Sequence, residues 1–371
     1  MNGRWKVDAR AGRSRPWRFL DRDTVRRIRK NGLIKKVVVF AVISASAAVA
    51  GAQTGAAGKR ARTQPLVLTG AIPLANTQGR IDHLGVDHKG RLFVSALGNN
   101  SEEAIDLGAG RVTHSVPVPR PQGVVYAAAS NELFVGSDEG KLYIYNDSLE
   151  LVTSIDFGDD VDNLRYDAAN KLVYVAYGDD DAGAIAAIDT TTNKRLEHEF
   201  KLGAHPESFQ LETAGPGIYV NLPDLKQIAV INRHTHAITR WPLKVESNFP
   251  MALDEAGHTL FVVTHAPALL LALDTATGRQ RAALPTVQNS DDVFFDAARK
   301  RAYVPGGEGS IDVFQRINPS RYERLARIPT AVGARTGGYF GKGRKGFEVL
   351  YVAVPARADH GAEVLIYTVQ D

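Results

Sequence analysis

The chain has 371 residues, 44% hydrophobic and 23% charged, a mixture typical of soluble globular proteins and enough for a large core or two domains. It contains no cysteine, which excludes disulfides, thiol catalysis and a lipid-anchored cysteine. The net charge of +4 comes from residues 1–36, which carry +10, so the remainder carries −6 and lacks the basic surface of a nucleic-acid binder.

An apolar run of 14 residues, VVVFAVISASAAVA (37–50), follows Lys35 and Lys36, and small residues that fit an A-x-A cleavage site come next. The run is short for a membrane span. We therefore interpret residues 1–52 as a secretory signal peptide with an extended basic N-region, which predicts a periplasmic or secreted protein. An uncleaved anchor helix is the alternative, and only then would the chain contact a membrane. Residues 53–63 are small and polar and are interpreted as a linker.

From residue 64 onward, a short β-rich run ending in small residues recurs seven times. The central valines of these runs are Val94, Val135, Val175, Val220, Val262, Val304 and Val352. Their spacing stays between 40 and 48 residues. A period of this length is typical of propeller blades.

Each repeat contains the same sequence of short apolar segments, separated by turns rich in Asp, Asn and Gly. LRYDAANK (164–171) precedes a valine run, AIAAID (184–189) follows it, and more polar strands such as LVTSIDF (151–157) end a unit. Four antiparallel strands in about 42 residues predict an all-β fold, a seven-bladed β-propeller spanning residues 64–371.

The seventh unit lacks its last strand, whereas LVLTGAIPL (66–74) precedes the first unit without a partner. We therefore expect this N-terminal strand to complete the seventh blade and close the ring, because closure protects the sheet edges. A pair of β-sandwiches, the alternative, explains neither the constant period nor the spare strand.

The motifs YVAY (174–177), YVNL (219–222), YVPG (303–306) and YVAV (351–354) resemble the repeat that names the YVTN β-propeller family. The segments IDHLGVD, PQGVVY, DNLRYD, HPESFQLE, NFPMALDE, DDVFFDA and GARTGG are similar to the YncE-like branch of secreted bacterial propellers. The resemblance covers roughly residues 64–371. It implies a propeller with WD40-like repeats but no particular activity, since propellers host binding, scaffolding and catalysis alike.

In a propeller, the first strand of each blade (strand a) lines the central channel, and binding sites are often built on the residues that lead into it. The candidate ligand-binding residues at these positions are Arg80, Asp82, His83, Arg120, Gln122, Asp162, Asn163, His205, Glu207, Asn248, Asp291, Asp292 and Arg335. Buried carboxylates need counter-charges, which Arg80, Arg120 and Arg335 or a bound cation would supply. Alternatively, the acids and arginines only pair with one another and pin neighbouring blades.

The same residue types suit a metal-assisted hydrolase. Several propeller lactonases hold one divalent cation on channel-facing Glu, Asn and Asp residues. Similarity to them implies Asn163, Glu207, Asn248 and Asp291, or Asp292 in its place, as ligands of calcium or another divalent cation, and Asp82 or His83 as a base. The sequence makes no cofactor certain.

The sequence favours a monomeric binding module for a ligand or protein of the cell envelope, without nucleic acid, over a lactonase-like enzyme. No G-x-S-x-G motif or phosphate-binding loop is present. A quinone-dependent dehydrogenase fits less well, because Trp241 is the only tryptophan of the repeat region. The acidic segment GDDDAG (178–183) is interpreted as a hairpin loop.

Overall fold

The computed structural model describes residues 64–342 and 348–371, so the expected signal peptide and linker lie outside the described residues. Within those two ranges, no helix is both long and apolar enough to span a membrane. The described chain forms seven antiparallel β-sheets, which are the blades that the repeat predicts.

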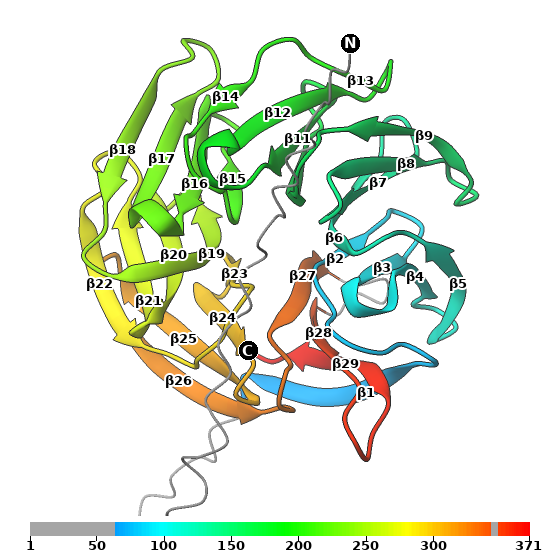
Figure 1. Cartoon of the computed structure of the whole chain (residues 1–371). Helices are drawn as coiled ribbons and strands as arrows, with labels where there is room; N and C mark the ends of the chain where they lie inside the picture. Colours follow the sequence, from blue (N-terminus) through cyan, green and yellow to red (C-terminus); the bar gives the residue numbers. More distant parts are fainter. Residues whose placement is uncertain (1–63, 343–347) are drawn as a thin grey trace, which may run out of the picture. The chain divides into compact units, whose positions relative to one another are not determined.

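Each blade contains strands a, b, c and d in order from the channel outward (Figure 1). The a strands are β2 (Leu84–Val86), β6 (Pro121–Ala127), β10 (Val161–Asp167), β15 (Phe209–Leu211), β19 (Glu246–Asp254), β23 (Phe294–Asp296) and β27 (Thr336–Lys342). The b strands are β3 (Arg91–Ala96), β7 (Glu132–Ser137), β11 (Leu172–Tyr177), β16 (Gly217–Leu222), β20 (Thr259–Ala266), β24 (Arg301–Gly306) and β28 (Glu348–Val354). All seven b strands include the valine runs on which the repeat was recognised.

The two outer positions complete the blades. The c strands are β4 (Ser101–Asp106), β8 (Lys141–Tyr145), β12 (Ala184–Asp189), β17 (Gln227–Asn232), β21 (Ala268–Asp274), β25 (Ser310–Asn318) and β29 (Ala362–Val369). The d strands are β5 (Arg111–Pro117), β9 (Leu151–Asp156), β18 (Ile238–Pro242), β22 (Gln280–Pro285), β26 (Arg321–Pro329) and β1 (Leu66–Leu74). In blade 3 this position is divided between β13 (Lys194–Arg195) and β14 (Phe200–Lys201), which both pair with β12.

The N-terminal strand closes the ring, as the spare segment predicts. β1 pairs antiparallel with β29 from Leu66 opposite Val369 to Leu74 opposite Ala362, and Figure 1 shows the two ends of the colour scale side by side in one blade. The strand is anchored by the buried side chains of Leu66, Ile72 and Leu74. The first and last strands of the described chain therefore stabilise one sheet together.

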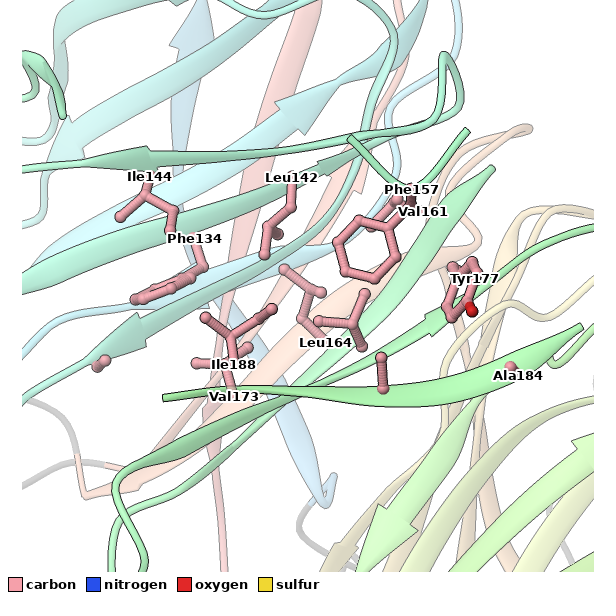
Figure 2. Packing of buried hydrophobic residues seen from close by; sticks show 13 residues of the cluster. Phe134, Leu142, Ile144, Phe157, Val161, Leu164, Val173, Tyr177, Ala184 and Ile188 are labelled. Carbon is pink, nitrogen blue, oxygen red and sulfur yellow. The ribbon is translucent and has the colours of Figure 1, made fainter. Parts of the chain in front are cut away.

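The hydrophobic core lies between neighbouring blades. Figure 2 shows Phe134, Leu142 and Ile144 of blade 2 packed toward Leu164 and Val173 of blade 3. Because every sheet is covered on both faces, strand-b residues that point in opposite directions are all buried, which explains the nearly continuous apolar runs. Burial of apolar area between blades is the main stabilising term of this fold.

The loops between strands b and c meet the residues that lead into strand a. Three of these loops include short 3-10 turns, η2 (Leu97–Asn99), η3 (Asp180–Ala182) and η4 (Pro223–Leu225). One backbone hydrogen bond recurs in several blades: Gly98 N donates to Arg80 O at 2.8 Å, and Gly178 N donates to Asp160 O at 2.8 Å. The b–c loops thus hold the start of strand a in place at one mouth of the channel.

Candidate functional site

Strand register places seven equivalent side chains around this mouth. Strand-a residues such as Leu84 and Leu164 pair with the repeat valines Val94 and Val175. In each blade, we call the residue two positions before this valine-paired strand-a residue the ring residue. The ring residues are Asp82, Gln122, Asp162, Glu207, Phe249, Asp291 and Arg335. Four of the seven equivalent positions therefore carry a carboxylate.

A second layer, the rim, lies two residues before the ring. Its polar members are Arg80, Arg120, Asp160, His205, Ser247 and Asn289. Rim and ring residues contact one another: Arg80 Nη2 lies 3.1 Å from Asp82 Oδ2, and His205 Nε2 lies 3.7 Å from Glu207 Oε1. In blades 1 and 4, rim and ring residues therefore form ionisable pairs.

On the side formed by blades 1, 6 and 7, the carboxylates have cationic partners. Arg335 Nε lies 2.8 Å from Asp291 Oδ2, and Arg80 lies 3.7 Å from the same oxygen. His83 Nδ1 lies 3.5 Å from Asp292 Oδ1. Burial alone would lower the pKa of His83, but Asp292 and Asp82 outweigh burial and raise it to about 10, so the imidazole is a cation at neutral pH.

The opposite side, formed by blades 3 and 4, lacks such compensation. We call Asp160, Asp162, Asp179 and Glu207, with His205 among them, the acidic sector. In the described part of the chain, no lysine or arginine nitrogen lies within 4.0 Å of these four carboxylates, and only His205 pairs with them, at 3.0 Å to Asp179 and 3.7 Å to Glu207. Carboxyl groups without arginine or lysine partners are therefore concentrated on one side of the mouth.

Burial and mutual repulsion keep these carboxyls from ionising freely. Burial raises the pKa of Asp162 and the pKa of Glu207; Asp82 raises both pKa values further, and His83 offsets part of the increase in both. Burial, followed by Asp162, also raises the pKa of Asp160 to about 9. Desolvation and like charges both disfavour a carboxylate, and a bound cation would reverse that balance.

Beyond the ring, the channel opens into a cavity of about 330 Å³ lined by residues of all seven blades. Its wall is mixed: apolar side chains such as Leu84, Leu164 and Phe294 lie beside the polar side chains of His83, Gln210 and Asp292. Arg165 also lines it, donating to the carbonyl of Leu164 at 2.8 Å and lying 5.3 Å from the centre of the Phe209 ring. The mouth thus leads from a charged ring to a chamber of mixed polarity with a part-buried guanidinium in its wall.

Two predicted ligands are engaged elsewhere. Asn248 lies one residue before the ring, and its amide nitrogen donates to Asn221 Oδ1 at 2.8 Å and to Gln227 O at 3.0 Å, between blades 4 and 5. Asn163 donates to Asp162 Oδ2 at 2.8 Å. Of the predicted metal set, Glu207 contacts His205, whereas Asp291 pairs with Arg335 and Arg80 on the other side.

The other predicted residues surround the mouth without joining the acidic sector. Arg120 forms an ion pair with Asp138 of its own b–c loop, and Gln122 donates to Asp160. Asp292 accepts from the backbone N–H of Gly337 at 2.9 Å, linking blades 6 and 7. Much of the ring therefore joins adjacent blades, as expected if its acids and arginines pair with one another. The carboxylates of the acidic sector have no arginine or lysine partner in the described part of the chain.

Sequence reasoning left Asp179 and Arg165 out of the candidate site. Asp179 belongs to GDDDAG, which is a hairpin loop as predicted, but the loop is held against the start of strand a and so brings its carboxylate to His205. Arg165 follows Leu164 in β10 and reaches the chamber. Both residues could have been found from their positions in the repeat, because b–c loops and alternate strand-a residues face the channel.

Solved structures share this fold. A chain of the structure described as "Crystal Structure of Mitotic Checkpoint Complex" matches with a TM-score of 0.67 and 13% identity, covering 91% of this chain and 100% of that chain. "Crystal structure of RRP9 WD40 repeats" matches with a TM-score of 0.69 and 12% identity, over 81% and 97%. A chain of "Kuenenia stuttgartiensis Hydrazine Synthase" matches with 0.65 and 16%, over 76% and 96%.

At these identities the likeness concerns the fold alone. No protein-family model and no curated protein sequence matches the chain. The ring of seven four-position blades and these structural neighbours together establish a seven-bladed β-propeller of the WD40-like type.

Proposed function

We propose that this protein is an extracytoplasmic, monomeric binding module of the YncE-like type, which takes a small cationic ligand into the strand-a mouth of its channel. The location and the family assignment are supported by the apolar N-terminal segment and by the sequence motifs of the repeats. The choice of ligand charge is supported by the site itself.

One observation carries the proposal: the acidic sector lacks arginine and lysine partners, whereas the carboxylates across the mouth have them. Asp162 and Glu207 occupy equivalent ring positions in adjacent blades, and both have His205 as a neighbour. Uncompensated carboxylates at a partly desolvated site are costly, and a cation recovers that cost. The sector therefore selects positive charge.

The chamber adds a size and polarity requirement. A cavity of about 330 Å³ whose wall combines apolar and polar groups suits a compact organic body. A ligand with an ammonium group at the ring and an apolar body in the chamber would match both. A concave site of this size favours a small ligand over a flat protein surface.

A metal-assisted lactonase is the second candidate. The observation that favours it is that ligand atoms of Asp162, His205 and Glu207 lie within 4.8 Å of one another. A metal held there could polarise a carbonyl in the chamber. Hydrolysis of a lactone panel that disappears with a chelator would favour this enzyme, and binding without turnover would favour the module.

The binding proposal is tested by calorimetric titration with two probes of similar size and opposite charge, 2-phenylethylammonium and 3-phenylpropionate. The ammonium is expected to bind and the carboxylate is not. Asp162→Asn and Glu207→Gln should each weaken ammonium binding about tenfold, corresponding to roughly 1.4 kcal/mol. Glu323→Gln is the matched control, because this exposed glutamate pairs only with Arg321.

Equal binding of both probes, or no heat from the ammonium, would overturn the proposal. Salt provides an independent check, since an electrostatically selected cation should bind more weakly as ionic strength rises.

A further inference from the structure

Three side chains of the acidic sector have the arrangement of a metal centre. Ligand atoms of Asp162, His205 and Glu207 all lie within 4.8 Å of one another, and Nε2 of His205 is 3.7 Å from Oε1 of Glu207. Two ligands bound at about 2.1 Å to one ion with tetrahedral geometry are roughly 3.4 Å apart. The spacing is therefore close to that of groups sharing an ion.

The hydrogen bonding of His205 also supports a metal centre. Its Nδ1 lies 3.0 Å from Asp179 Oδ1 and 3.1 Å from the carbonyl oxygen of Gly178. Two acceptors at Nδ1 place the proton of the neutral ring there, so Nε2 presents a lone pair toward Glu207 and Asp162. Metal-binding histidines are commonly oriented by a carboxylate or carbonyl at the other nitrogen in this way.

Asp162 provides an independent observation. Its side chain is only 7% exposed, and Oδ2 accepts a hydrogen bond from Asn163. Within the described chain, no hydrogen-bond donor contacts Oδ1. A carboxylate oxygen without a protein donor, on a largely buried side chain whose ligand atom lies within 4.8 Å of those of His205 and Glu207, is available to bind a cation.

We propose that Asp162, His205 and Glu207 bind one divalent transition-metal ion, with Asp179 positioning His205. This inference rests on the proposed function and deepens it by naming a metal ion, in place of an organic ammonium, as the cation that the acidic sector takes. The imidazole nitrogen distinguishes the site from the calcium set predicted from sequence, since calcium prefers oxygen ligands and imidazole suits Zn²⁺ and its neighbours. Three protein ligands leave a coordination position open toward the mouth.

The test uses the metal-stripped full chain and measures Zn²⁺ binding by equilibrium dialysis and calorimetry, with Co²⁺ as a spectroscopic probe. One ion per chain is expected, with Ca²⁺ and Mg²⁺ binding far more weakly. Bound Co²⁺ should show the d–d absorption of a four- or five-coordinate ion with a nitrogen ligand. These measurements need no variant and stand even if a substitution prevents folding.

Variants then distinguish metal binding at these three residues from nonspecific electrostatic attraction of cations to the acids at the mouth. Asp162→Asn, His205→Ala and Glu207→Gln should each weaken Zn²⁺ binding at least tenfold and alter the Co²⁺ spectrum. Glu323→Gln, at an exposed position away from the mouth, should change affinity less than threefold. Asp179→Ala should weaken binding about tenfold, as second-layer changes do, while Asp179→Asn retains an acceptor for Nδ1 and restores most of the affinity.

Absence of Zn²⁺ binding overturns the inference, as does equal weakening by every variant, the control included. If 2-phenylethylammonium still binds in that case, the proposed cation-binding function stands and the metal centre alone is rejected. If the ammonium also fails to bind, both are rejected.

Discussion

Nε2 of His205 lies 3.7 Å from Oε1 of Glu207, on the side of the channel mouth where the ring acids lack arginine and lysine partners. The two residues are two positions apart in the chain, as rim and ring residues of blade 4. Their contact follows from the extended backbone before β15, in which alternate residues point the same way. The pair illustrates the asymmetry of the mouth, because Glu207 has a histidine as its neighbour whereas Asp291 across the mouth pairs with arginines.

Ring closure by β1 predicts unequal effects of substitutions along that strand. Ile72 is 2% exposed and packs among blades 7 and 1, whereas Leu68 is 53% exposed. Ile72→Ala should lower the free energy of unfolding by about 2–5 kcal/mol through lost burial and a cavity. Leu68→Ala should change it by less than about 0.5 kcal/mol. Chemical denaturation measures both, and equal effects would argue against closure by this strand.

A buried ion pair between blades 3 and 4 should matter more than an exposed one. Arg233 Nη1 lies 2.8 Å from Asp167 Oδ2, and both side chains are about nine-tenths buried. Asp167→Ala leaves the guanidinium without its carboxylate and should cost about 3–5 kcal/mol. Glu246→Ala, which removes the exposed partner of Lys226, should cost under about 1 kcal/mol. Thermal and urea unfolding would show whether the two losses differ.

Glu102 should make stability depend on pH. Burial raises the pKa of this carboxyl well above its usual value, even though Ser95 donates to Oε2 at 2.8 Å. The folded state therefore binds a proton more tightly than the unfolded state. This contribution is fully present below the unfolded pKa, near 4.3 for a free glutamate, and is lost as pH rises toward the folded value.

Glu102→Gln removes this titration. The melting temperature of the variant should fall less than that of the parent between pH 5 and pH 8, and the difference should be greatest at the higher pH. Glu139→Gln, at an exposed position, serves as the control. Parallel melting curves for the parent and Glu102→Gln across this range would contradict the assignment.

Gly123 predicts a direct link between blade packing and the site. A Cβ atom at this position would lie 2.1 Å from the backbone oxygen of Asp162. Gly123→Ala should therefore displace β10, lower stability by at least about 1–3 kcal/mol and weaken cation binding. Gly361→Ala, where a Cβ meets nothing within 4 Å, should leave both unchanged. Unfolding and calorimetric titration on the same samples provide the comparison.

Much of the fold was predictable because it depends on local, repeated signals. The valine runs, their period and the unpaired segment 66–74 each report on backbone pairing within a few dozen residues, and the structure confirms the seven blades and their closure. Positions before strand a were also predictable, since alternation in an extended chain is set by geometry.

The grouping of side chains at the mouth required the tertiary structure. Asp162 and Glu207 are 45 positions apart, and Asp179 reaches His205 only because a b–c loop is bonded to the start of strand a. Asn248 resembled a ring residue in sequence but lies one position too early and faces Asn221. The sequence by itself determined the blades and the residue types near the channel. Only the packing of the blades decided which charged side chains meet. The reason is that Coulomb energy depends on the distances between charges on different strands, and no local sequence pattern encodes those distances.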